Sequence, residues 1–155
     1  MENDTWEVKL LTFPLRQVPD SSYTILQSNT QCNLMHWAAL FRNSRGDVLV
    51  LEGLRHGRML VPNISNWFDT ERVRSEVLLG HIESNEYCIM HIGNKQRAAP
   101  YDVIQSNCQT YVINVLHEFG IDVPGHIRTF GDPIWQHEHF IPRTMMGAGE
   151  HCILL

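Results

Sequence analysis

The chain has 155 residues, of which 43% are hydrophobic and 19% charged, a balance typical of one folded domain with a single buried core. Its formal net charge is -5 with the nine histidines neutral, and no block of lysine and arginine occurs. Because contacts to phosphates require clustered positive charge, these values argue against a nucleic-acid-binding protein.

Targeting signals are not expected. The first residues, Met1 to Asp4, are acidic and precede no apolar run of the kind found in secretion signals. No stretch approaches the roughly 20 apolar residues that cross a bilayer. The four cysteines lack the paired spacing of a zinc site. We therefore expect a reduced, cytoplasmic setting with free thiols, and neither a metal nor another cofactor.

The first two thirds of the chain predict strands. Residues 5–13 alternate apolar and polar side chains, which is typical of a strand. Residues 34–42 and 47–54 flank the turn signal Asn-Ser-Arg-Gly, so they are expected to form an antiparallel hairpin. Residues 72–82 and 86–92 are interpreted as two further strands.

The clearest helix is predicted over residues 107–119. Ser106 or Asn107 can cap its start and Gly120 can end it. One face of this helix carries Cys108, Tyr111, Val112, Val115 and Phe119. The expected fold is therefore α+β, an antiparallel sheet packed on a helix that has a cysteine at its N-terminus. We expect one domain over residues 1–144 and a flexible tail over residues 145–155.

Cys108 is the first candidate for chemistry. A helix start carries free N–H groups and partial positive charge, which stabilise a thiolate and a developing oxyanion. The alternative is that Cys108 is a small buried hydrophobe, a common fate of free cysteines. Cys32 and Cys88 lack this helix-start context and are interpreted as structural.

His36 is the candidate base, because a histidine inside an apolar strand requires a partner. Alternation places it on one face of the strand with Ala38, whose small side chain would leave room for a helix end to approach. The alternative is a core histidine bonded to the backbone. Glu52 on the partner strand is the first candidate to orient the imidazole, followed by His56 and His81.

Two blocks, His36-Trp37-Ala38 and Pro100 to Val112, resemble the lecithin:retinol acyltransferase-like phospholipase/acyltransferases. The same order of His before Cys occurs in PPPDE peptidases, and both groups have circularly permuted papain-like (NlpC-type) folds. The resemblance spans residues 34–120. It implies that Cys108 is the nucleophile and His36 the base.

The implied reaction is attack of the thiolate on an acyl, amide or isopeptide carbonyl, followed by hydrolysis or transfer of the acyl group. The backbone N–H of Cys108 would bind the oxyanion, with Gln109, Tyr101 and Asn107 as further oxyanion or substrate contacts. The chain departs from the family at two positions. The stretch from Val48 to Glu52 lacks the second histidine of the family, so the alternatives are that Glu52 replaces it or that the site is a dyad, and Gln109 stands where the family has a glutamate.

The chain ends in Cys152-Ile153-Leu154-Leu155, which fits the C-a-a-X prenylation pattern. A prenylated Cys152 would attach the protein to a membrane; the alternative is an apolar tail packed on the domain. The partner we expect is a small-molecule, lipid or peptide acyl substrate. The rival functions are a non-catalytic binding module of the same fold and a biosynthetic transferase or cyclase using the same thiol.

Overall fold

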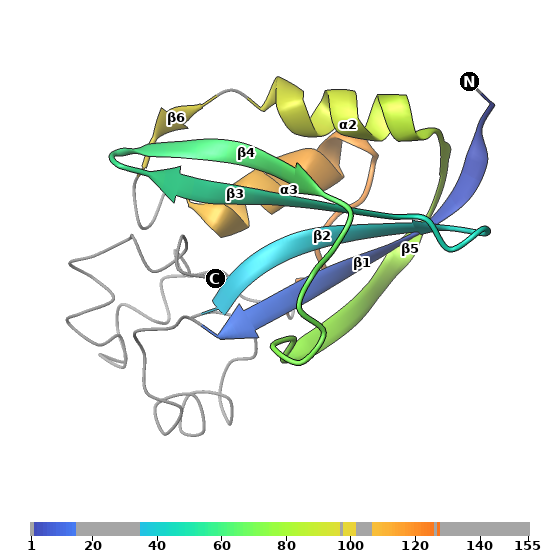
Figure 1. Cartoon of the computed structure of the whole chain (residues 1–155), viewed down its shortest axis with the longest axis horizontal. Helices are drawn as coiled ribbons and strands as arrows, with labels where there is room; N and C mark the ends of the chain where they lie inside the picture. Colours follow the sequence, from blue (N-terminus) through green and yellow to red (C-terminus); the bar gives the residue numbers. More distant parts are fainter. Residues whose placement is uncertain (1, 15–34, 97, 102–106, 126, 128–155) are drawn as a thin grey trace.

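The protein is an α+β structure. A computed structural model describes residues 2–14, 35–96, 98–101, 107–125 and 127. Within these residues, six strands form one antiparallel sheet in the order β5-β1-β2-β3-β4-β6, as Figure 1 shows. The elements are β1 (Asp4–Pro14), β2 (Met35–Asn43), β3 (Val48–His56), β4 (Met59–Ser65), β5 (Ser75–Ser84), α2 (Glu86–Lys95), β6 (Ala99–Pro100) and α3 (Cys108–Glu118).

The predicted hairpin is confirmed. β2 and β3 pair antiparallel, with Leu40 opposite Val50. The turn between them is closed by Asn43, whose side-chain oxygen accepts hydrogen bonds from the backbone N–H of Arg45 and of Asp47. Gly46 has a φ of 88°, a conformation that glycine adopts without steric cost. The strands predicted over residues 5–13 and 72–82 are also present, as β1 and β5.

The sheet carries an apolar core on each face. Trp37, Ala39 and Phe41 of β2 belong to the larger core, which also contains the buried side chains of α3. Ala38 and Leu40 belong to a smaller core on the other face. The alternation predicted for β2 is therefore confirmed, but the expectation that α3 would approach the Ala38 side is wrong. The helix packs on the face with the larger aromatic surface, where burial of apolar area is greatest.

A glycine allows α3 to lie close to the sheet. A Cβ atom at Gly53 of β3 would lie 2.8 Å from Cβ of Tyr111 on α3 and 3.0 Å from a methyl group of Leu60. Real Cβ atoms do not approach one another so closely, so the position requires glycine. The contact fixes the height of α3 above β3 and thereby the position of its first residue.

The strand predicted over residues 86–92 is wrong, because this segment belongs to α2. Asn85 caps the helix, with its side-chain oxygen accepting the N–H of Cys88 at 2.9 Å. Ile89 and Gly93, one turn apart, form its buried side. Cys88 lies in the first turn of this helix and is exposed, so the interpretation of it as a structural thiol without a helix-start context is wrong. Strands β4 and β6 were not anticipated from the sequence.

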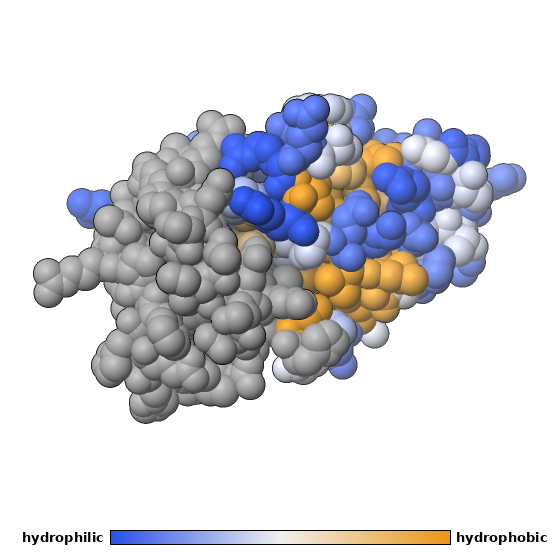
Figure 2. All heavy atoms as spheres, turned by 90° about the horizontal axis from the view of Figure 1, so that it is seen from below, coloured by the Kyte–Doolittle hydropathy of each residue, from blue (hydrophilic) through white to orange (hydrophobic). Residues whose placement is uncertain are grey.

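The outer surfaces are mixed in polarity. Figure 2 shows the underside of the molecule, where apolar areas alternate with hydrophilic ones. Leu78 of the edge strand β5 is one exposed apolar residue, at 55% of its accessible area. Among the residues that the structure describes, no helix has the length and hydropathy needed to cross a membrane. The proposed tail and Cys152 lie outside the described residues.

Candidate functional site

The first turn of α3 is held by a capping box. The side-chain oxygen of Asn107 accepts the N–H of Gln109 at 2.9 Å and of Thr110 at 3.0 Å. In return, the backbone N–H of Asn107 donates to the Thr110 hydroxyl at 2.8 Å. Of the two predicted caps, Ser106 and Asn107, the structure therefore has Asn107, and Cys108 is the first residue of the helix.

Loss of this cap is expected to destabilise the protein measurably. Asn107→Ala should lower the free energy of unfolding by about 1–2 kcal/mol, because the side chain is buried and satisfies two N–H groups. Asn85→Ala, which removes a half-buried cap with one bonded N–H, should cost about 0.5–1 kcal/mol. Urea unfolding of both variants checks the order. If both substitutions lower the free energy of unfolding by the same amount, the α3 cap does not stabilise the protein more than the α2 cap.

Gln109 ties the start of α3 to the start of β2. Its side-chain Nε2 donates to the carbonyl oxygen of Met35 at 3.1 Å, and the side chain is buried. Cys108 and His36 are the chain neighbours of these two bonded residues. The structure therefore brings the candidate nucleophile and the candidate base to the same end of the sheet, by way of a bond that sequence analysis did not anticipate.

His36 lies beside Glu52, with 3.7 Å between Nε2 of the imidazole and Oε1 of the carboxylate. This distance exceeds that of a direct hydrogen bond. The pairing of β2 with β3 ends at Ala39 and Leu51. His36 and Glu52 both lie beyond this last pair, at the same end of the two strands. The ring of Phe13 on β1 lies on the other side of His36, with 6.0 Å between the ring centroids. His36 is thus held between a carboxylate and an aromatic ring.

A pocket of about 370 Å³ opens beside this pair. Its described walls are Phe13, His36, Glu52, Asn63 and Ser65 of the sheet, together with Trp67–Asp69 of the segment after β4. We call it the aromatic–acidic pocket. Cys108 is not among its described wall residues: it is 1% exposed and belongs to the larger core on the helix side.

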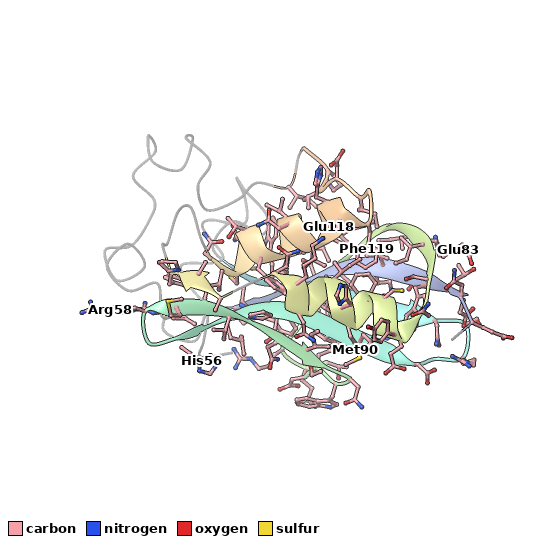
Figure 3. All side chains as sticks on the ribbon, turned by 90° about the horizontal axis from the view of Figure 1, so that it is seen from above. His56, Arg58, Glu83, Met90, Glu118 and Phe119 are labelled. Atoms are coloured by element: carbon pink, nitrogen blue, oxygen red, sulfur yellow. The ribbon has the colours of Figure 1, made fainter. Side chains whose placement is uncertain are left out.

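The other predicted residues lie away from this pair or serve other contacts. His56 is exposed at the end of β3, and Figure 3 shows it with Arg58 at one end of the molecule and Glu83 at the other. His81 is exposed on β5, opposite Glu7 of β1. Neither histidine takes part in the contact between His36 and Glu52.

Tyr101 is held at the β3–β4 turn. Its ring lies under the guanidinium of Arg55, 4.9 Å from the centroid, and its backbone N–H donates to the carbonyl of Arg58 at 2.8 Å. In the described structure, Tyr101 therefore stands beside the turn of the β3–β4 hairpin. Its assignment to the oxyanion stays a prediction.

Tyr111 is a buried phenol on the second turn of α3, and it donates a hydrogen bond to the carbonyl of Gly93 at 3.0 Å. Burial raises the pKa of Tyr111 well above its usual value, and the negative charge of Glu52 adds to the shift. The folded state therefore holds this proton at pH values where the unfolded chain releases it.

The stability that this proton provides is complete below the ordinary tyrosine pKa of about 10 and is lost as the pH rises above it. We expect the free energy of unfolding to fall more steeply above about pH 10 in the wild type than in Tyr111→Phe. Denaturant unfolding at several alkaline pH values measures both slopes. Identical slopes would show that Tyr111 does not contribute.

One wall of the pocket, formed by Asn63, Ser65 and Trp67–Asp69, was not predicted from the sequence. The one available signal was an aromatic pair followed by an acid, Trp67-Phe68-Asp69, in a segment without strand or helix periodicity. Within the described ranges, no group of three or more potential metal ligands occurs.

Comparisons of this chain with protein-family models, with curated proteins and with solved structures found no match. The likeness to the permuted papain-like enzymes therefore depends on the residues around His36 and Cys108 alone.

Proposed function

We propose that the protein is a cysteine-dependent acyl-transfer enzyme, a hydrolase or acyltransferase, with a permuted papain-like arrangement of its sheet and α3. The observation that carries the proposal is the bond from Gln109 to Met35, which places a cysteine at a capped helix start next to the strand end that holds His36. The adjacent carboxylate of Glu52 supports the role of His36 as a base.

The proposed reaction has two steps. His36 accepts the proton of the Cys108 thiol, and the thiolate attacks the carbonyl carbon of the substrate, with the N–H of Cys108 donating to the oxyanion. The bond to the leaving group breaks, the leaving group takes the proton from His36, and an acyl-thioester remains. Water or an amine or alcohol then attacks the thioester, and the thiol is restored. Glu52 stabilises the protonated imidazole throughout.

For the proposed reaction, the thiol of Cys108 and the imidazole of His36 must meet around the end of the β2–β3 ladder. Cys108 belongs to the larger core and His36 to the wall of the aromatic–acidic pocket. The pairing of β2 with β3 stops at Ala39–Leu51. In the proposed site, the thiol and the imidazole approach each other there, beyond the last ladder pair.

Acylation by p-nitrophenyl acetate tests the proposal. The active protein should release p-nitrophenolate and gain the mass of one acetyl group on Cys108, which hydroxylamine removes. His36→Gln should lower the acylation rate at neutral pH by about 10²–10⁴-fold, because general-base catalysis contributes a factor of this size. Acetylation of Cys88 instead of Cys108, or an unchanged rate in His36→Gln, would contradict the proposal.

The second candidate function is a non-catalytic binding module of the same fold. The burial of Cys108 at 1% exposure and its absence from the described pocket wall favour it. In that case, the pocket beside His36 is the working site and Cys108 only fills the core. A protein that binds a ligand in the pocket but is never acylated at Cys108 would support this alternative.

A further inference from the structure

Three aromatic rings surround the aromatic–acidic pocket. Phe13 comes from the end of β1, and Trp67 and Phe68 come from the segment after β4. Trp67 is 70% exposed, although an indole of this size normally buries most of its surface. The π face of an aromatic ring attracts a cation, and indole does so most strongly. The rings therefore favour a positively charged ligand with apolar surface.

The charged walls of the same pocket are acidic. Glu52 of β3 and Asp69 of the segment after β4 both line it, and no lysine or arginine is among the described wall residues. Asp69 is positioned by its own turn: one carboxylate oxygen accepts the N–H of Glu71, and its carbonyl accepts the N–H of Arg72, both at 3.1 Å. Two carboxylates that face one hollow create a negative potential that attracts cations.

We propose that the aromatic–acidic pocket binds a small organic cation, an alkylammonium group, between the rings of Trp67 and Phe68 and the carboxylates of Glu52 and Asp69. The cavity of about 370 Å³ is at the small end of ligand sites and fits a methylated ammonium or the end of a lysine side chain. Asn63 and Ser65 supply neutral hydrogen-bonding groups in the same wall.

A cation bound in the pocket would also lie close to the proposed catalytic residues. His36 lines the same wall, so an ammonium group held there lies next to the candidate base. This role rests on the proposed function: the bound group would be the amine that accepts the acyl chain, or the charged end of the acyl donor. Binding of the cation itself requires no catalysis.

Calorimetric titration with two matched pairs of ligands tests the inference. The first pair is choline and its neutral isostere 3,3-dimethylbutan-1-ol. The second is Nα-acetyl-lysine methylamide and its norleucine analogue. We expect each binding cation to exceed its neutral partner in affinity by at least about tenfold. Preference for choline indicates a small-molecule or headgroup source, whereas preference for the lysine derivative indicates a protein side chain.

Three variants locate the binding. Trp67→Ala and Asp69→Asn should each weaken cation binding by about fivefold or more. Asn retains the acceptor for the Glu71 N–H, and Trp67 is largely exposed, so both variants should fold. Glu71→Gln is the matched control. The neighbouring hollow is lined by Glu71 and also by Trp67, Phe68 and Asp69, whereas Glu71 does not line this pocket, so Glu71→Gln should bind as the wild type does.

Binding of the cation does not depend on any reaction of the Cys108 thiol. Cys108→Ser should bind the cation as tightly as the wild type, even if no acylation of Cys108 is ever observed. Neutral isosteres that bind as well as the cations, or equal losses in Asp69→Asn and Glu71→Gln, would overturn the assignment of this pocket to an ammonium group.

Discussion

Replacement of Cys108 by serine is expected to lower the rate of acylation by p-nitrophenyl acetate by at least ~10³-fold, because the hydroxyl has no accessible anionic form at neutral pH. The substitution changes the volume little at a buried position, so the free energy of unfolding should fall by only about 1–2 kcal/mol. Stopped-flow absorbance measures the rate and urea unfolding measures the stability. A large fall in the acylation rate together with a small fall in the free energy of unfolding would identify Cys108 as the nucleophile.

The matched control is Cys88→Ser, which alters an exposed thiol on α2. It should leave both the acylation rate and the stability unchanged. If Cys108→Ser reacts as fast as the wild type, or if Cys88→Ser loses the activity, the nucleophile has been assigned to the wrong residue.

Gly53→Ala is expected to destabilise the whole domain by about 2–3 kcal/mol. The new Cβ would meet Cβ of Tyr111 at 2.8 Å, and this atom cannot rotate away because it is attached directly to the backbone of α3. Relief requires a shift of α3 from β3, which would also displace the start of the helix. Urea unfolding should show the loss in stability, and the acylation rate of Cys108 should fall with it.

Gly125→Ala provides the comparison, since no atom of the described residues lies within 4 Å of a Cβ placed there and Gly125 shows no positive φ. Its stability should stay within about 0.5 kcal/mol of the wild type. Equal stability of the two alanine variants would contradict the close packing of α3 on β3.

Local patterns predicted the elements whose signals are strong. The β2–β3 hairpin followed from a turn with Asn43 and Gly46 between two apolar runs, and α3 followed from helical spacing with a cap and a terminal glycine. The segment over residues 86–92 was misassigned because its short apolar run fits a strand as well as a helix. The helix is decided by the Asn85 cap and by packing of Ile89 and Gly93 on the sheet.

The site is harder to predict because it depends on contacts between distant parts of the chain. The proximity of Glu52 to His36 could be anticipated from the hairpin, although the register was not known. The bond of Gln109 to Met35 joins residues 74 positions apart, and no local pattern encodes it. The pocket wall from Asn63 to Asp69 depends in the same way on how the segment after β4 returns over the sheet.

The rate at which iodoacetamide alkylates Cys108, measured by peptide mapping between pH 5 and pH 10, tests most directly whether the thiol is activated by His36. We expect half-maximal reactivity below the ordinary thiol pKa of about 8.5 and a shift to higher pH in His36→Gln. Cys88 serves as the internal reference in the same samples, because it is exposed and lies on a different helix. If Cys108 reacts more slowly than Cys88 at every pH and is unaffected by His36→Gln, then Cys108 is a structural thiol and the acyl-transfer function is wrong.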